Sequence, residues 1–132
     1  MKKVLIIGGT LMAIHIVLSE LRKKSPSITY VEKMPFGYNA MTIPPFGIII
    51  DEKEKENIEL LNHELIHWKQ YQSMGTLGYY VNYAIGSIKY GYDAHPMELE
   101  ARANETEYCK KNYTACVRNG LARTVKDKHF RL

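Results

Sequence analysis

One segment near the middle of this 132-residue chain constrains its fold more than any other. Between Asn57 and Met74, apolar residues recur at the spacing of an α-helix and form one stripe, made of Ile58, Leu61, Leu65 and Trp68. His63 and His67 are four residues apart, so they fall together on a different face, which also carries Leu60 and Tyr71. The segment therefore predicts an amphipathic helix whose two imidazoles point the same way.

The residues on this second face suit metal chemistry. Two neutral imidazole nitrogens on successive turns can bind one ion, and Glu64 supplies a carboxylate at the edge of the same face. We predict that His63 and His67 bind Zn²⁺ and that Glu64 is a general base acting on a water molecule. The alternative interpretation is a solvated pair of histidines partnered by carboxylates.

Zinc needs a third protein ligand, normally His, Asp or Glu. The next stretch with such residues contains His95, Glu98 and Glu100. His95 precedes Pro96, which suits the first turn of a helix, so we expect His95 to lie outside that helix. Glu98 and Glu100 are about 200° apart around a helix, so only one can face the ion, and the spacing leaves open which.

The run His63-Glu64-Leu65-Ile66-His67, followed by a helix opening with Glu98-Leu99-Glu100-Ala101, resembles the gluzincin peptidases. The resemblance covers roughly residues 45–108 and is greatest to the small forms, namely minigluzincins and HtpX-like or phage- and Bacteroidetes-type relatives. It implies that Glu98 is the third ligand, because Ala101 follows it as in the family's Glu-x-x-Ala-Asp pattern. Arg102 stands where the family has its aspartate, which would orient a ligand histidine. Glu100, Asn104 and Glu105 are candidates to replace that aspartate.

The resemblance also implies a zincin-like fold: a short sheet, the metal-binding helix and a following helix that bears Glu98. It would make Gly47–Ile50 an edge strand over the cleft, to which an extended peptide could add as a further strand. Taken alone, the three isoleucines of that segment fit a buried core strand equally well.

The rest of the chain predicts an α+β protein with two short strands followed by three helices. The strands are expected at 28–32 and 47–50, with the prolines and glycines between 35 and 47 keeping any regular structure there brief. The helices are expected at 57–74, 77–90 and 96–119, and Gly75 ends the first. The second carries its apolar residues as a stripe of Leu77, Val81, Ala84 and Ile88.

Residues Val4–Leu18 form a nearly unbroken apolar run with basic residues at both ends. We predict that residues 1–24 are an uncleaved membrane anchor and that residues 25–132 form the metallopeptidase domain. A signal peptide would need a small-residue cleavage site after the run, and a nucleotide-binding strand at 3–10 would need further glycines. A helix packed on the domain is the remaining alternative. Because both flanks are basic, the orientation in the membrane is undetermined.

The net charge and the cysteine content constrain the function of the chain only weakly. The formal net charge of +4 is mildly basic and no nucleic-acid-binding motif accompanies it, so we predict no nucleic-acid partner. Cys109 and Cys116 lie about 10 Å apart on a straight helix, too far for a disulfide, and are expected to be ordinary half-buried thiols. The basic C-terminal tail is expected to be solvated.

Together these features predict a zinc-dependent hydrolase, specifically an endopeptidase acting on peptides or proteins, cell-wall peptides included, at a membrane of the cell envelope or a virion. The donor that stabilises the oxyanion is not ranked by the sequence; the candidates are Tyr71, Tyr79, Tyr80, Tyr83, Tyr90, Tyr92 and His95. The alternative is a non-enzymatic, membrane-anchored structural or assembly protein with a vestigial metal site, which Arg102 mildly favours.

Overall fold

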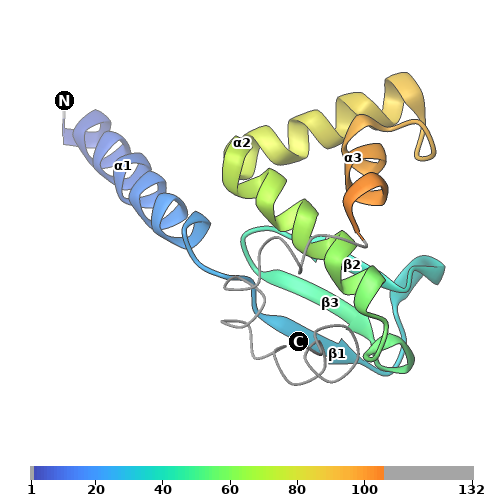
Figure 1. Ribbon diagram of the computed structural model, residues 1–132. Coiled ribbons are helices and arrows are strands. Elements are labelled where there is room, and N and C mark those ends of the chain that lie inside the picture. Colours follow the sequence, from blue (N-terminus) through green and yellow to red (C-terminus); the bar gives the residue numbers. More distant parts are fainter. Residues whose placement is uncertain (1, 106–132) are drawn as a thin grey trace, which may run out of the picture.

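The computed structural model describes residues 2–105, which form three α-helices and a three-stranded mixed sheet (Figure 1). The elements in chain order are α1 (Lys2–Arg22), β1 (Ile28–Val31), β2 (Ala40–Ile43), β3 (Gly47–Asp51), α2 (Ile58–Tyr90) and α3 (Pro96–Asn104). The predicted α+β class is confirmed. The predicted helix beyond residue 105, Cys109, Cys116 and the basic tail lie outside the described residues.

The sheet corrects two predictions. Its strand order is β1-β3-β2, with β1 parallel and β2 antiparallel to β3. The prediction of two strands was wrong, because β2 forms within the stretch rich in proline and glycine by pairing with β3 across a tight turn. The expectation that Gly47–Ile50 is an edge strand was also wrong. It belongs to the central strand β3, where Ile48 and Ile50 are buried, and β1 and β2 are the two edge strands.

Helix α2 consists of two arms joined by a sharp bend (Figure 1). Asn57 caps its start by accepting a hydrogen bond from the Leu60 amide. Gly75 has φ 79° and ψ 171°, a backbone conformation that glycine adopts without steric cost, so the helix breaks there as predicted. We call residues 58–74 the first arm and residues 76–90 the second arm.

The first arm packs its predicted stripe against the sheet. Ile58, Leu61 and Leu65 join Ile48 and Ile50 in one buried cluster. Burial of each such side chain contributes about 1.5–3 kcal/mol, so this contact fixes the first arm on the sheet. A second cluster lies around the bend and connects both arms to α3; its members are Trp68, Tyr71, Tyr79 and Met97.

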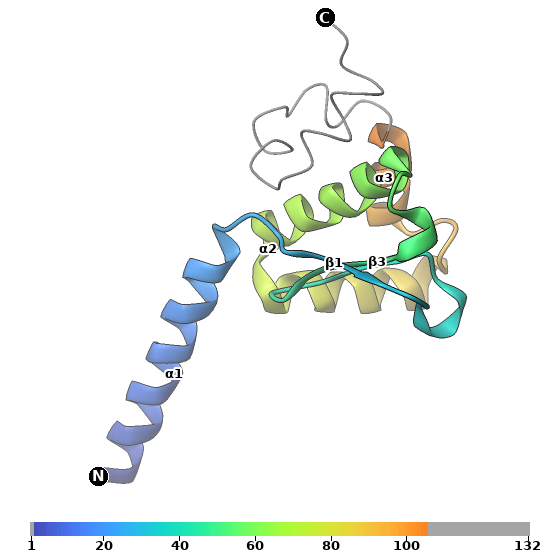
Figure 2. The same ribbon diagram turned by 90° about the horizontal axis from the view of Figure 1, so that it is seen from below.

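Helix α1 extends away from the domain (Figures 1 and 2). Its 21 residues give it a length of about 31 Å, which matches the hydrocarbon thickness of a bilayer. Among residues 2–105 it is the one helix long and apolar enough to cross a membrane. The described side chains of its apolar run are exposed to at least an intermediate degree, which contradicts the alternative that this run packs on the domain.

Helix α1 is joined to the bend of α2 through Arg22. The guanidinium of Arg22 donates hydrogen bonds to the carbonyls of Gln72 (2.5 Å) and Ser73 (2.8 Å). Carbonyls at the end of a helix lack partners within the helix, so a cation there is stabilising. Arg22 therefore ties the exit of α1 to the end of the first arm.

Candidate metal centre

Three predicted ligands from two helices converge on one point. The Nε2 atoms of His63 and His67 are 3.1 Å apart. The carboxylate of Glu98 reaches down from α3, with Oε2 3.1 Å from the Nε2 of His63 and Oε1 3.3 Å from the Nε2 of His67. Two ligands of a tetrahedral zinc ion are separated by about 3.3 Å, so this triangle has the size that such an ion requires.

The other nitrogen of each histidine faces an acceptor oxygen. Nδ1 of His67 lies 2.8 Å from Oε1 of Gln70, and Nδ1 of His63 lies 3.0 Å from Oε2 of Glu105. An imidazole nitrogen facing an acceptor carries the proton, which leaves the lone pair on Nε2. Both Nε2 lone pairs and a carboxylate therefore point into the same space, and a cation is what relieves their mutual repulsion. The donor set fits a divalent metal ion.

Of the three residues considered as a replacement for the expected aspartate, the structure brings Glu105 to the triad. Glu105 contacts His63, whereas Glu100 accepts from the side-chain amide of Gln70 (2.8 Å) and Asn104 donates to the Glu100 carbonyl (2.9 Å). Glu98, not Glu100, faces the histidines. Arg102 turns away from the site and donates to the carbonyl of Asp93 at 2.9 Å.

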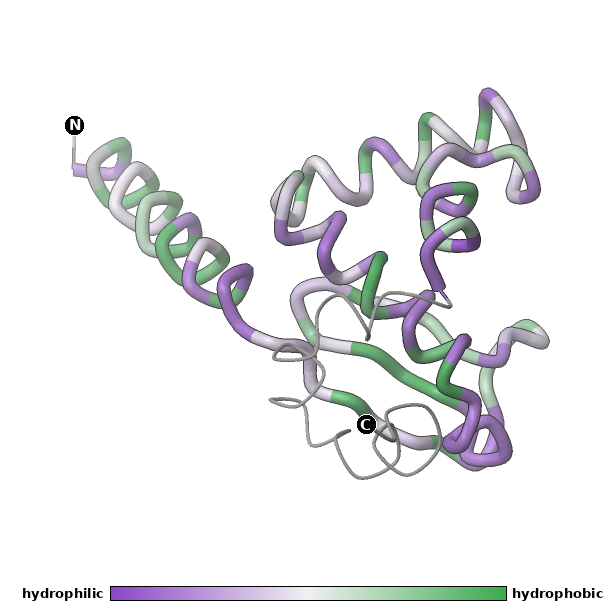
Figure 3. The backbone as a smooth tube through the Cα atoms, viewed as in Figure 1, coloured by the Kyte–Doolittle hydropathy of each residue, from purple (hydrophilic) through white to green (hydrophobic). Residues whose placement is uncertain are grey.

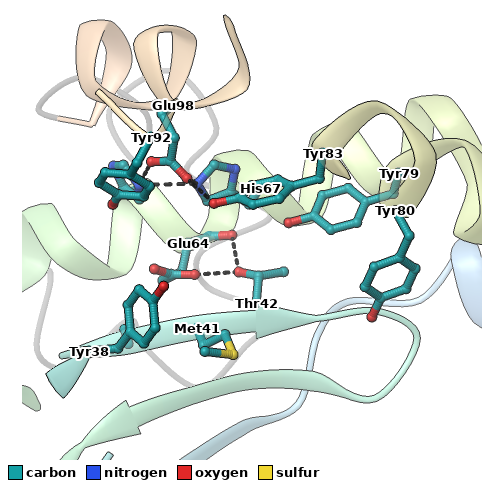
Figure 4. Close-up of a pocket in the computed structure, with 12 residues that line it drawn as sticks. Tyr38, Met41, Thr42, Glu64, His67, Tyr79, Tyr80, Tyr83, Tyr92 and Glu98 are labelled. Atoms are coloured by element: carbon teal, nitrogen blue, oxygen red, sulfur yellow. Dashed lines mark hydrogen bonds and ion pairs between the residues drawn. The ribbon is translucent and has the colours of Figure 1, made fainter. Parts of the chain in front are cut away.

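Glu64 lies beside the triad and is held by Thr42 of β2 (Figure 4). The hydroxyl of Thr42 is 2.6 Å from its Oε2 and also 3.0 Å from its backbone carbonyl. Burial raises the pKa of Glu64, and the hydrogen bond from Thr42 opposes that rise. The result is an oriented carboxyl group with a higher proton affinity than an exposed glutamate, as a general base requires.

The electrostatic environment of His63, His67 and Glu98 favours a positive charge between them. Burial acts to raise the pKa of Glu98, but the hydrogen bonds with His63, His67 and Tyr83 outweigh it and leave that pKa well below its usual range. Burial acts to lower the pKa of His63, and its hydrogen bonds with Glu98 and Glu105 outweigh it, so the pKa is raised. The carboxylates thus create a site that attracts positive charge, whether a proton or a metal ion.

The triad opens into a pocket of about 210 Å³ between β2 and the second arm (Figure 4). Its walls include Thr42 and Met41 from β2 and five tyrosines, which are Tyr38, Tyr79, Tyr80, Tyr83 and Tyr92. The hydroxyl of Tyr83 donates to Oε1 of Glu98 at 2.8 Å. Burial raises the pKa of Tyr79, Tyr83 and Tyr92, which keeps these hydroxyls protonated and able to donate.

This geometry narrows the predicted oxyanion donors to Tyr79 and Tyr92, because the single hydroxyl proton of Tyr83 is already donated to Glu98. Four of the other candidate donors either lie outside the pocket or use their polar atoms in hydrogen bonds with other groups. Tyr71 is fully buried in the second cluster, Tyr90 does not line the pocket, and the hydroxyl of Tyr80 donates to the Pro44 carbonyl. His95 lies outside α3, as predicted, and its ring caps that helix.

His95 also fixes the second arm against α3. Its Nδ1 accepts from the Met97 amide (3.1 Å), so its Nε2 carries the proton and donates to the Tyr83 carbonyl (2.9 Å). A Cβ atom at Gly86 would lie 2.5 Å from that Nε2, so the close approach of arm and ring depends on glycine. This contact positions Tyr83 over Glu98.

Sequence reasoning missed Thr42, Gln70 and the specific role of the tyrosines. Gln70 follows His67 by three residues on the same helix, a spacing that could have indicated it. Thr42 and Tyr83 become neighbours of the site through the fold alone. The chain matches no protein-family model, no curated protein and no solved structure.

Proposed function

We propose that this protein is a zinc-dependent hydrolase, specifically an endopeptidase, with His63, His67 and Glu98 as ligands and Glu64 as general base. One observation carries the proposal: the two Nε2 atoms and the Glu98 carboxylate lie 3.1–3.3 Å from one another. The Nδ1 atoms of the same histidines point away from this triangle and contact Glu105 and Gln70. The fold that goes with this assignment is the zincin-like one implied by the resemblance to gluzincins.

A zinc ion in this site would act as a Lewis acid that lowers the pKa of water and polarises a carbonyl group. Glu64 takes a proton from the attacking water, and Thr42 keeps the carboxylate aimed at it. Glu64 then gives the proton to the leaving amine. Neutral tyrosine hydroxyls on the opposite wall donate hydrogen bonds to the oxyanion.

The substrate segment is proposed to lie along β2. This strand is one of the two edge strands of the sheet, and its residues Ala40, Met41 and Thr42 line the pocket. An extended peptide can add to such an edge through main-chain hydrogen bonds, which would bring its carbonyl groups past Glu64. The role that the family resemblance gave to the strand at 47–50 thus passes to β2.

We further propose that α1 anchors the enzyme in a membrane. Its length, composition and exposed surface support this, as does the basic cluster at its domain end, Arg22, Lys23 and Lys24. The anchor proposal fails if the full-length protein stays in the soluble fraction without detergent.

The experiment that tests the function compares Glu64→Gln with Glu59→Gln in the full chain. Glu59 is an exposed glutamate on the same helix and serves as the matched control. Both variants are expected to retain one zinc per chain, whereas Glu64→Gln loses about 10²–10⁴-fold in hydrolysis of casein or of cell-wall peptides. An active Glu64→Gln protein contradicts the proposal. Zinc binding with no hydrolysis by the parent chain would support the non-enzymatic alternative.

A further inference from the structure

The second arm of α2 has an apolar outer face with no partner among residues 2–105. Leu77, Val81, Ile85 and Ile88 are 77%, 44%, 58% and 88% exposed. At about 100° per residue they form one stripe along the helix, and Ala84 completes it. The opposite face of the same arm carries Tyr79 and Tyr83 of the pocket. Exposed apolar stripes of this kind mark an interaction surface.

The charges around this face are those of a helix at a lipid surface. No charged residue occurs from Gln70 to Ile88, and Lys89 follows at the end of the stripe beside Tyr90. The basic residues Arg22, Lys23 and Lys24 lie at the other end, near the bend. Lysine, arginine and tyrosine are favoured at the membrane–water interface, where their apolar parts are buried and their polar ends reach the headgroups.

A bilayer that α1 entered, as proposed above, would lie beside the same face. Arg22 bonds to the carbonyls of Gln72 and Ser73, so α1 leaves the domain at the point where the second arm begins. In both ribbon views α1 extends toward the side of the domain that the second arm occupies (Figures 1 and 2). Hydrophobic residues recur along both helices (Figure 3). Four acidic residues precede or begin α2 in the chain, namely Glu52, Glu54, Glu56 and Glu59, and Figure 1 shows the start of α2 apart from the second arm.

We propose that the outer face of the second arm lies in the interface of the bilayer that α1 enters. Interfacial helices bury their apolar side about 5–10 Å into the boundary between headgroups and acyl chains. The pocket lies on the other side of this one helix, about 10 Å away, so the site faces polypeptide close to the membrane surface. The inference rests on the proposed anchor and is independent of the proposed zinc chemistry.

The test measures the depth of nitroxide labels on the full chain, with Cys109 and Cys116 replaced by serine. Single labels are introduced through Ile85→Cys on the stripe, Ile14→Cys on α1 and Glu59→Cys on the first arm. The protein is reconstituted in vesicles of phosphatidylcholine with phosphatidylglycerol. We expect the labels at 85 and 14 to collide severalfold more with dissolved oxygen than with an aqueous nickel complex, and the label at 59 to show the reverse.

Any other pattern of label depths contradicts the inference, and the label at 14 shows whether the proposed membrane anchor fails with it. If the label at 14 is in lipid while the label at 85 behaves like that at 59, the anchor stands and the arm does not touch the membrane. If both are in water, the anchor fails as well. A label at 85 that neither reagent reaches means that protein, such as a second copy of the chain, covers the stripe instead.

A second measurement excludes an effect of the label itself. With the label at Val81→Cys, the pair of changes Ile85→Asp and Ile88→Asp is expected to shift the label toward the aqueous reagent by severalfold. Ser87→Asp, which lies beside the stripe, is the matched control and should leave it nearly unchanged. Equal shifts in the two proteins would contradict a lipid-facing stripe. Far-UV circular dichroism serves as the check that the variants stay folded.

Discussion

The two arms of α2 have apolar residues at the same helical spacing but place them in opposite environments. The stripe of the first arm, from Ile58 to Trp68, is no more than 6% exposed and packs against the sheet or at the bend. The stripe of the second arm is 44–88% exposed at Leu77, Val81 and Ile88. Periodicity therefore identifies a helix and its apolar side but does not say whether protein or another medium covers that side.

The two arms also contribute different residues to the candidate metal centre. The first arm supplies His63, His67 and Glu64, which are at most four residues apart and reach the site through helical geometry alone. The second arm supplies Tyr79 and Tyr83, which reach the site because Gly75 reverses the chain and His95 fixes the arm to α3. Substitutions matched between the arms can test this division.

The largest expected difference is in the free energy of unfolding. Leu65→Ala in the first arm should cost about 2–5 kcal/mol, because it opens a cavity in the core cluster. Ile85→Ala in the second arm should change it by no more than about 0.5 kcal/mol, because that side chain is exposed. Urea unfolding of the full chain in detergent micelles measures both. Similar losses would mean that the outer stripe is packed against protein.

The next effect concerns the contact between the second arm and α3. Gly86→Ala places a methyl group 2.5 Å from a histidine ring that is held at both nitrogens, so we expect a loss of about 1–3 kcal/mol. Ser87→Ala, one residue on and exposed, is the control and should be nearly neutral. Urea unfolding again provides the measurement. A neutral Gly86→Ala would show that the arm is not fixed by His95.

The contribution of the second arm to metal binding is tested by Tyr83→Phe. Removal of the hydroxyl that donates to Glu98 should weaken zinc binding by about 10–100-fold, since partners that orient a ligand commonly have effects of that size. Tyr90→Phe on the same arm is the control, because Tyr90 does not line the pocket. Competition with a chelating dye measures both affinities. Equal zinc affinities in the two variants would show that the second arm does not contribute to zinc binding.

The smallest expected effect is a shift in a single titration. In the metal-free protein, the pKa of His63 is above its ordinary value of 6.5, because its hydrogen bonds with Glu98 and Glu105 favour the imidazolium over the effect of burial. Glu105→Gln removes one of these carboxylates, so the pKa of His63 should fall. Glu100→Gln is the control, since Glu100 bonds to Gln70. Proton NMR of the imidazole follows the titration, and an unchanged or higher pKa in Glu105→Gln would contradict the contact.

Sequence patterns that span only a few residues predicted the features of the fold that depend on short-range interactions. The helix at 57–74, its break at Gly75 and the position of His95 before Pro96 all depend on neighbours within a few residues. The spacing of the histidines likewise placed them on one face. These features could be read from the sequence because helix geometry and capping are short-range.

Other features depend on partners distant in the chain and were missed for that reason. Strand β2 lies among prolines and glycines, and its pairing with β3 makes it a strand. This pairing also makes Gly47–Ile50 part of the central strand and Ala40–Ile43 an edge strand. Thr42 meets Glu64 only through that sheet. The choice of Glu98 over Glu100 followed from the family resemblance, whereas helical spacing alone left it open.

The most direct test of the central claim is a crystal structure of the zinc-loaded protein with diffraction recorded at the zinc absorption edge. We predict one anomalous peak about 2.0–2.2 Å from the Nε2 atoms of His63 and His67 and from a carboxylate oxygen of Glu98. A peak bound elsewhere, or a zinc ion whose third ligand is Glu100, would contradict it.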